Sequence, residues 1–359
     1  MDLPRPLAAL LPLVARPIVI IGAGGIVRDA HLPAYRLAGF PVASIQDLNA
    51  DRARALAADF GIPAVHATLA AAVAAAPADA VFDVAVPASA LPAVLAGLPD
   101  GAPVLIQKPF GENLAQAREL LALCRRKRLR AAVNFQLRHA PAIQAARDLI
   151  AAGAIGELHD IEVRVTVHMP WHQWTFLEQS ARVEILYHSI HYLDLIRSFA
   201  GEPDGIYAKT LKSPLAPRLH STRTAMILDY GERLRATVTT NHAHDFGLRH
   251  QESYVKWEGT RGAIKTQLGL LMDYPRGVRD YLEVCSFDTG SSVREWREEP
   301  LAGSWFPHAF IGTMAGVMRH ANGEAGAPPT HVEDAARTMA LVEAAYESSA
   351  RGATPIHSP

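Results

Sequence analysis

Two histidines, a tyrosine and an aspartate lie close together in ILYHSIHYLDLIRSF, residues 185–199. The i, i+3 and i+4 spacing predicts that one helix face carries Tyr187, His188, His191, Asp194 and Leu195. A lone histidine on such a face is more often a core residue than a base, but this much polarity is costly to bury unless it is used. The segment is therefore a candidate site for moving protons.

Lys108 is a second candidate for chemistry. It ends the apolar, strand-like run 102–108 and precedes Pro109, so the backbone cannot continue there as a helix. We expect its ammonium group to lie over the edge of a sheet, where a positive charge favours a developing alkoxide. A surface lysine in a loop is the alternative.

Aromatic residues and histidines form a third group. One set follows a predicted strand, and the other ends a second strand: His168, Trp171, His172 and Trp174, then His242 and His244. Aromatic faces beside hydrogen-bonding groups suit a sugar ring. Histidine pairs also ligate zinc, but no carboxylate or cysteine stands at ligand spacing, so we expect no metal. Exposed loop aromatics without a ligand are the remaining alternative.

A glycine turn begins the fold that must position these groups. The β-branched run 18–21 predicts a buried strand, and three glycines follow it at once: Gly22, Gly24 and Gly25. From Ile26 onward the residues have helical character, so the turn presents free backbone N–H groups and a positive helix end to one point. This arrangement predicts a phosphate site.

Asp47 completes the pattern of a dinucleotide site. It follows the apolar run PVASI, where a carboxylate can accept hydrogen bonds from ribose hydroxyls. Repeated strand and helix patterns continue to residue 133 and predict a parallel sheet with helices on both faces. Pro87, Lys108 and Gln136 stand at or just after strand ends, which places them near the cofactor.

The pattern changes to alternating polar and apolar residues after about residue 155, which is typical of an antiparallel sheet with one covered face. We therefore predict an α/β Rossmann domain at 1–138 and an α+β domain with a large, mainly antiparallel open sheet at 139–359. A helix at about 330–351 closes the chain.

Composition excludes several classes of protein. The 359 residues carry a formal net charge of -1, which gives no basic face for nucleic acid and no polybasic membrane anchor. Cys124 and Cys285 are too few for a disulfide framework, and reduced thiols indicate a cytoplasmic protein. The apolar N-terminal segment is interrupted by prolines and leads directly into the first strand, so we expect a packed arm and not a signal peptide.

Several motifs resemble the Gfo/Idh/MocA oxidoreductases, the family of glucose-fructose oxidoreductase and inositol dehydrogenase. They are GAGGIVRDAHLPAYR (22–36), DLNADRARALAADFGI (47–62), IQKPF (106–110), NFQLRHAP (134–141), GAIGELHDIEV (153–163) and HSIHYLDLIRSFAGEP (188–203). The resemblance covers most of the chain. It implies a homodimer or homotetramer that packs through the outer face of the second sheet.

The resemblance also implies roles for single residues. Lys108 matches the lysine that reaches the cofactor ribose and the substrate hydroxyl, and His191 matches the acid/base histidine, with Asp194 after it. The chain departs from the family at three positions. Gln107 replaces a glutamate, Tyr187 replaces an aspartate, and Val27 stands where a small residue is usual, which we expect a slightly displaced helix to accommodate.

Together these features predict an NAD-dependent oxidoreductase that transfers hydride from a hydroxyl of a sugar, polyol or sugar acid to nicotinamide. Two alternatives remain: an NAD-recycling glycosidase or lyase of the same fold, and a dinucleotide-binding sensor. Asp47 favours NAD over NADP, because its carboxylate repels a 2′-phosphate. Because Tyr187 removes an acid, Lys108, Arg138 and the histidines favour an acidic substrate.

Overall fold

The structure is a computed structural model that describes residues 8–287 and 293–356. The chain forms two compact units, one of Met1–Pro141 with Ala302–Met339 and one of Ala142–Leu301 with Ala340–Pro359. The first unit thus takes up residues 302–339, which the predicted limits at 1–138 and 139–359 gave to the other domain. No helix within the described ranges is long and apolar enough to cross a membrane.

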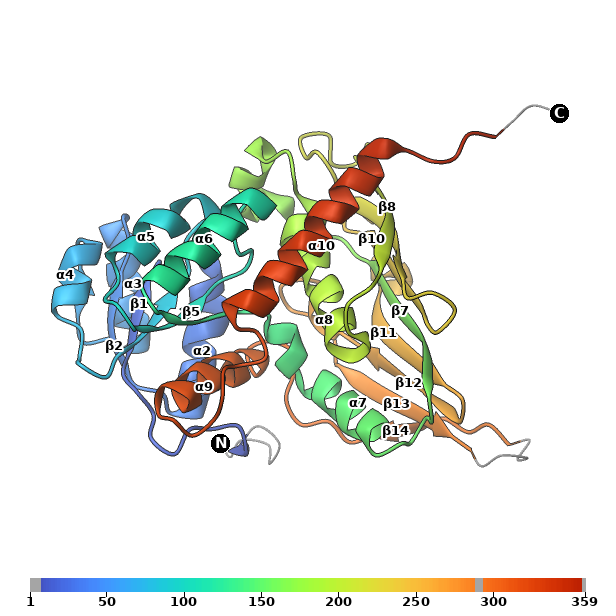
Figure 1. Ribbon diagram of the computed structural model, residues 1–359, viewed down its shortest axis with the longest axis horizontal. Coiled ribbons are helices and arrows are strands. Elements are labelled where there is room, and N and C mark those ends of the chain that lie inside the picture. Colours follow the sequence, from blue (N-terminus) through green and yellow to red (C-terminus); the bar gives the residue numbers. More distant parts are fainter. Residues whose placement is uncertain (1–7, 288–292, 357–359) are drawn as a thin grey trace. The chain divides into compact units, whose positions relative to one another are not determined.

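The first unit contains a six-stranded parallel sheet in the order β3-β2-β1-β4-β5-β6 (Figure 1). Its strands are β1 Ile18–Ile21, β2 Val42–Gln46, β3 Val65–His66, β4 Val81–Val84, β5 Pro103–Ile106 and β6 Arg130–Val133. This order brings the carboxyl ends of β1, β2, β4 and β5 to one edge, as in a Rossmann fold. The predicted fold class is confirmed.

Helices cover both faces of this sheet. They are η1 Val27–His31, α2 Leu32–Ala38, α3 Ala50–Phe60, α4 Leu69–Ala74, η2 Ala88–Ala90, α5 Leu91–Gly97, α6 Leu114–Arg126, η3 Gln136–His139 and α9 Ala309–Ala321. The helices α2 and α9 contact each other, as do α5 and α6, and Figure 1 shows the two pairs on opposite sides of the sheet. Since α9 is apolar around most of its surface and contacts β5 and β6, it packs with the first unit.

Local sequence signals fix the ends of these helices. The Asn49 side chain accepts a 3.0 Å hydrogen bond from the Arg52 N–H at the start of α3, and Gly61 ends that helix with φ 68°. After the glycine turn, however, residues 27–31 form a π-helical turn before α2 begins. Val27 is fully buried in this turn.

The predicted N-terminal arm is described from residue 8 onward, and residues 1–7 lie outside the described part of the chain. Arg16 donates hydrogen bonds to the Asn322 side chain at 2.5 Å and to the Ala321 and Asp79 carbonyls at 3.0 Å each. The arm therefore packs on the first unit near the end of α9.

The second unit contains an eight-stranded sheet in the order β14-β13-β12-β11-β7-β10-β9-β8 (Figure 1). Its strands are β7 Leu158–Thr166, β8 Gly205–Leu211, β9 Arg223–Asp229, β10 Arg235–Asn241, β11 Glu252–Gly259, β12 Gly262–Gln267, β13 Tyr281–Ser286 and β14 Arg297–Glu299. All neighbours pair antiparallel except β7 and β10, which run parallel. This mixed sheet confirms the predicted mainly antiparallel architecture.

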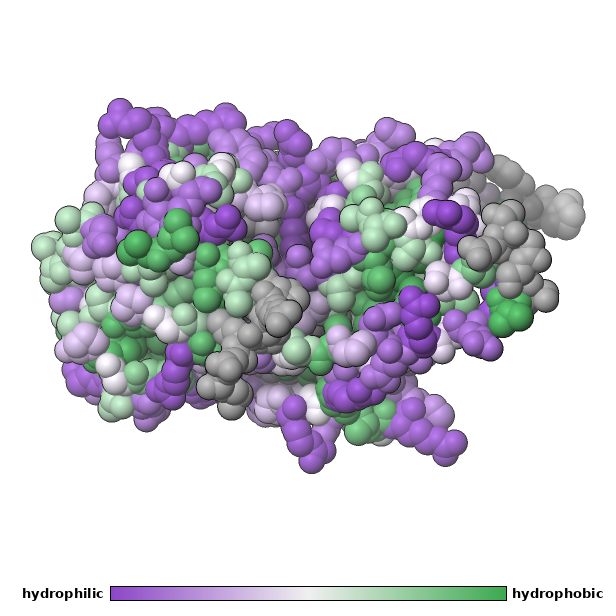
Figure 2. Space-filling view, turned by 90° about the horizontal axis from the view of Figure 1, so that it is seen from below, coloured by the Kyte–Doolittle hydropathy of each residue, from purple (hydrophilic) through white to green (hydrophobic). Residues whose placement is uncertain are grey.

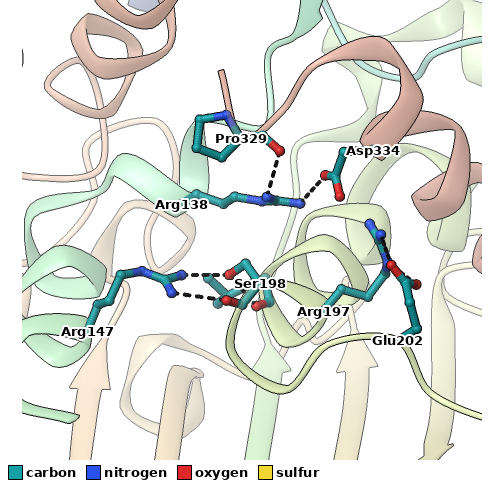
Figure 3. Close-up of polar contacts among 8 residues, drawn as sticks. Arg138, Arg147, Arg197, Ser198, Glu202, Pro329 and Asp334 are labelled. Carbon is teal, nitrogen blue, oxygen red and sulfur yellow. Dashed lines mark hydrogen bonds and ion pairs between the residues drawn. The ribbon is translucent and has the colours of Figure 1, made fainter. Parts of the chain in front are cut away.

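Helices and short helical turns complete the chain. They are α7 Pro141–Ala151, η4 Trp171–Gln173, η5 Thr175–Gln179, η6 Ile185–Ser189, α8 Ile190–Ala200, η7 Leu248–His250, η8 Gly269–Leu271 and α10 Val332–Arg351. Arg147 on α7 donates to the Ser198 carbonyl at 3.0 Å and to its hydroxyl at 2.7 Å, which joins α7 to the end of α8 (Figure 3).

Candidate functional site

The carboxyl edge of the first sheet brings the glycine turn and Asp47 together. The Asp47 Oδ2 atom accepts a 2.7 Å hydrogen bond from the Ala23 N–H, and Oδ1 accepts one of 2.7 Å from the Asn49 N–H. The carboxylate that follows β2 is thereby fixed against the turn that follows β1. Each oxygen keeps a further lone pair for a ribose hydroxyl.

Two glycines of the turn have different physical roles. Gly22 has φ +110°, and a Cβ atom there would lie 2.3 Å from the Ala85 carbonyl oxygen, so this position requires glycine to pack against the end of β4. A Cβ atom on Gly24 would meet nothing within 4 Å, and Gly25 and Ile26 also retain exposed surface. The open concave turn fits the pyrophosphate of a dinucleotide.

Lys108 and Gln136 lie at the same edge, after β5 and β6. Lys108 is half-buried, and burial lowers the pKa of its ammonium group to about 8. Gln136 is 1% exposed, and its Oε1 atom has no hydrogen-bond partner among the described groups. A buried amide oxygen left in this way fits a ligand donor at the sheet edge. Pro87 begins the turn η2 after β4.

A buried polar network includes Gln107, the residue before Lys108. The Asn134 amide group donates to Gln107 Oε1 at 2.9 Å and lies 3.2 Å from His31 Nε2, while His31 Nδ1 lies 2.7 Å from Asp83 Oδ2. The Tyr35 hydroxyl donates to the same Asp83 oxygen at 2.8 Å. Burial and the neighbouring Asp83 raise the pKa of the Tyr35 hydroxyl well above its ordinary value.

Sequence reasoning missed this network. Asp83 in the middle of an apolar strand was the available signal, because a fully buried carboxylate needs partners. The network ends at Gln107, so it fixes the backbone position directly before Lys108.

Arg138, which the sequence analysis assigned to the substrate site, is bound to groups of the first unit. Its guanidinium group donates to the Pro329 carbonyl at 3.1 Å and to Asp334 Oδ2 at 2.7 Å, and Figure 3 shows it directed at both groups. The side chain is 9% exposed. A guanidinium group engaged in this way holds η3 against the start of α10.

The predicted regular helix around Tyr187 and His191 is also wrong in part. Residues 185–189 form a π-helical turn, and the α-helix begins only at Ile190. His191 is therefore buried on the α-helix at 7% exposure, whereas Tyr187 and His188 lie on the wider turn and are half-buried. The Tyr187 ring meets the Phe176 ring edge to face at a centroid distance of 5.8 Å.

Several aromatic and histidine residues do come together in the second unit. Because β7 and β10 are parallel neighbours, His168 and His242 follow strand ends at the same sheet edge, where His168 pairs with Ala243. The Trp171 Nε1–H group donates to the His242 carbonyl at 3.2 Å. The His188 ring lies 5.2 Å from the Trp171 ring and 4.5 Å from the His242 ring, measured between centroids.

The other members of this predicted group lie less centrally. His172 is exposed, Trp174 packs against Tyr274 at 5.6 Å between ring centroids, and His244 packs against Phe246 at 5.3 Å. Among the described residues, no three histidine, cysteine, aspartate or glutamate side chains are grouped so that they could hold a metal ion.

Glu184 is a further residue that sequence reasoning missed. It is fully buried one residue before the π-helical turn, and its Oε1 atom lies 3.2 Å from His242 Nε2. No periodicity distinguishes it from its apolar neighbours Val183 and Ile185. Its only sequence signal is a carboxylate inside an apolar run.

Comparison with known proteins agrees with this geometry. Residues 16–135 match the family model described as oxidoreductase family, NAD-binding Rossmann fold, and residues 143–265 match the GFO/IDH/MocA C-terminal domain. D-apiose dehydrogenase of Paraburkholderia graminis is 28% identical over 346 residues, which cover 93% of this chain and 88% of that protein. A 1,5-anhydro-D-fructose reductase of Ensifer adhaerens is 32% identical over 43% of this chain and 46% of its own.

Solved structures share the fold. An oxidoreductase from Agrobacterium radiobacter in complex with NAD+, L-tartaric acid and magnesium has a TM-score of 0.77 at 24% identity, covering 95% of this chain and 98% of that one. Levoglucosan dehydrogenase in complex with NADH and levoglucosan has a TM-score of 0.77 at 19% identity, covering 94% and 98%. The chain belongs to the Gfo/Idh/MocA oxidoreductase family and is a dehydrogenase of CH–OH donors with an NAD-binding Rossmann domain.

Proposed function

We propose that the protein is an NAD-dependent sugar dehydrogenase that oxidises a secondary hydroxyl of a sugar, polyol or sugar acid. The observation that carries this proposal is the shared carboxyl edge of the first sheet, where the glycine turn follows β1, Asp47 follows β2 and Lys108 follows β5. Curated relatives that act on D-apiose and 1,5-anhydro-D-fructose, and a solved neighbour that binds levoglucosan, support a carbohydrate substrate.

In the proposed reaction different residues act on the proton and on the oxygen of the substrate hydroxyl. NAD, when bound to the glycine turn, supplies the acceptor for the hydride. His191 takes the hydroxyl proton as general base, and Lys108 stabilises the developing alkoxide. Because burial lowers the pKa of Lys108 to about 8, its ammonium group can also exchange a proton near neutral pH. Tyr187 stands four residues before His191 and offers a neutral hydroxyl there.

The cofactor preference rests on Asp47. Its carboxylate is held by the Ala23 and Asn49 N–H groups, so it cannot easily turn away from a bound ribose. The free ribose diol of NAD can donate hydrogen bonds to this carboxylate. The 2′-phosphate of NADP would be repelled, since the neighbouring Leu48 carries no positive charge to offset the repulsion. Equal or better catalytic efficiency with NADP would refute this preference.

The substrate class is proposed to include acidic sugars. With Tyr187 in place of an acid, a substrate carboxylate meets no repelling charge at that position. Tyr187→Asp should therefore weaken an acidic substrate more than its neutral analogue, while Tyr187→Phe should affect both alike. If Tyr187→Asp weakens both substrates equally, charge at this position does not select the substrate.

A screen of sugars, polyols and sugar acids tests the function, with NADH formation as the readout and NADP in place of NAD as the cofactor comparison. The expected result is NADH formation with at least one compound, and a roughly 10²-fold lower turnover for His191→Asn. Turnover without net NADH would instead indicate the NAD-recycling reaction. A His191→Asn enzyme with near-normal turnover would assign the base elsewhere.

We also propose a homo-oligomer that forms through the second sheet. Large apolar side chains are exposed on its edge strand β8 and on the neighbouring strand β9, where Tyr207 is 64%, Leu211 46% and Ile227 51% exposed. Figure 2 shows hydrophobic and hydrophilic residues interspersed on the face it presents. Light scattering of the protein and of an Ile227→Lys variant tests this, and a monomeric wild-type protein would refute it.

A further inference from the structure

A buried carboxylate in the second unit has no part in the chemistry proposed above. Glu184 is 0% exposed, and its Oε1 atom accepts a 2.7 Å hydrogen bond from the Ser189 hydroxyl. The same oxygen lies 3.2 Å from Nε2 of His242, which is also 0% exposed. Burial opposes ionisation of Glu184, but the nearby His242 and the hydrogen bond from Ser189 together outweigh it and hold the pKa of the carboxyl below its ordinary value. Glu184 is therefore an ionised group that faces His242.

His242 links this carboxylate to the half-buried His188. The two imidazole rings lie 4.5 Å apart between centroids at an interplanar angle of 40°. Trp171 meets the His188 ring at 5.2 Å and 79°, and its indole N–H donates to the His242 carbonyl. Two aromatic neighbours at a large angle to each other restrict the ring of His188, and both depend on the position of His242.

The surroundings of the pair are polar in a way that stability does not explain. Thr222 precedes β9 and Thr240 lies in β10, and both are buried beside His242 on the covered face of the sheet. The hydroxyl groups of these threonines and Glu184 Oε2 have no hydrogen-bond partner within residues 8–287 and 293–356. The same holds for both ring nitrogens of His242, so its Nε2 atom meets Glu184 at ion-pair distance without hydrogen-bond geometry. Buried polar atoms left in this way are unfavourable, so apolar residues here would stabilise the fold more.

We propose that Glu184 and His242 are positioning residues that hold the imidazole of His188 in the orientation in which it contacts the sugar. Glu184 fixes the ring of His242 and directs its Nε2–H group inward. His242, together with Trp171, then fixes the ring of His188 at the sheet edge. The contact between His188 and the sugar rests on the proposed function, whereas the fixing of the His188 ring does not.

The test variant is Glu184→Gln, which keeps the size and an acceptor oxygen but removes the charge. Its matched control is Asp160→Asn, since Asp160 is a buried carboxylate of the same unit, 6% exposed, whose 2.6 Å partner is Arg235. Ring 15N and 13C chemical shifts of His188, assigned with a His188→Asn variant, report its tautomer and ring order without any substrate. The Michaelis constants for sugar and for NAD are measured in parallel.

In Glu184→Gln the ring 15N and 13C shifts of His188 should move to values averaged over both tautomers. The KM for the sugar should rise roughly tenfold, which corresponds to the loss of about one hydrogen bond. The KM for NAD should stay unchanged. Asp160→Asn should change neither. If Glu184→Gln does not fold, Ser189→Ala removes one hydrogen bond from the same carboxylate and should give a smaller change in the same direction.

A native His188 signature in the folded variants overturns the proposal, as does a raised KM without a change in that signature. If no sugar is oxidised, the proposed function fails, but the chemical shifts still decide whether Glu184 positions His188.

Discussion

Lys108 should reduce the stability of the free protein at neutral pH, and Lys108→Met should remove that effect. Burial lowers the pKa of the ammonium group from 10.5 to about 8. At about 1.4 kcal/mol per unit this is a penalty of about 3 kcal/mol, and contact of the half-buried side chain with water reduces it to about 2 kcal/mol.

The sign of the pH dependence follows from proton binding. Below pH 8 the lysine is protonated in both states, so the native protein carries the full penalty. Between about pH 8 and 10.5 the unfolded chain binds more protons than the native protein, and stability rises with pH. Above this window the penalty is gone.

The assay is chemical unfolding of the free protein from pH 7 to 10.5. The stability of the wild type relative to Lys108→Met should rise by about 2 kcal/mol across this range. Lys127→Met is the control, because Lys127 is a lysine of the same unit that forms a 2.8 Å ion pair with Asp100. A difference between wild type and Lys108→Met that stays constant over the whole range would refute the reasoning.

Three further substitutions test the first unit. Gly22→Ala should destabilise the free protein by more than about 2 kcal/mol, because its Cβ atom would lie 2.3 Å from the Ala85 carbonyl oxygen at φ +110°. Gly24→Ala should keep a free energy of unfolding within about 1 kcal/mol of the wild type, because its Cβ atom would meet nothing within 4 Å, but it should bind NAD several-fold more weakly. Thermal melts and fluorescence titration measure the two effects. The opposite ranking of the two glycine variants would contradict the assignment of the turn. Arg138→Met should lower the free energy of unfolding by about 2–3 kcal/mol, because it removes the 2.7 Å contact with Asp334. The KM for the sugar should stay unchanged. A raised KM in a stable variant would show that Arg138 contacts substrate.

Much of the first unit could be predicted because its signals are local. The β-branched run, the glycines and Asp47 lie within one strand–helix–strand unit. Asn49 caps α3 through the N–H group of Arg52, which is only three residues along the chain. The position of α9 could not be predicted in this way. Its contacts with β5 and β6 join segments that lie far apart in the sequence, and an apolar helix fits any core.

The candidate site was predictable only as far as single elements allowed. Residue types and positions after strands suggested grouping His168 and Trp171 with His242. The parallel pairing of β7 and β10, which brings the two strand ends together, was not predicted. Helical periodicity failed at Tyr187, because apolar spacing does not distinguish an α-helical turn from a π-helical one. The partner of Glu184 lies 58 positions away, and no local rule connects such a pair.

The parallel pairing of β7 and β10 affects how this protein can change its substrate. Two segments that are distant in the chain leave the sheet side by side, after Thr166 and after Asn241, and each then continues into a loop that carries histidines. Substitutions and short insertions in either loop alter the same patch of surface without disturbing the backbone ladder beneath. Under the proposed function, selection can exchange one carbohydrate for another through either of two loops that share this patch while the sheet stays unchanged.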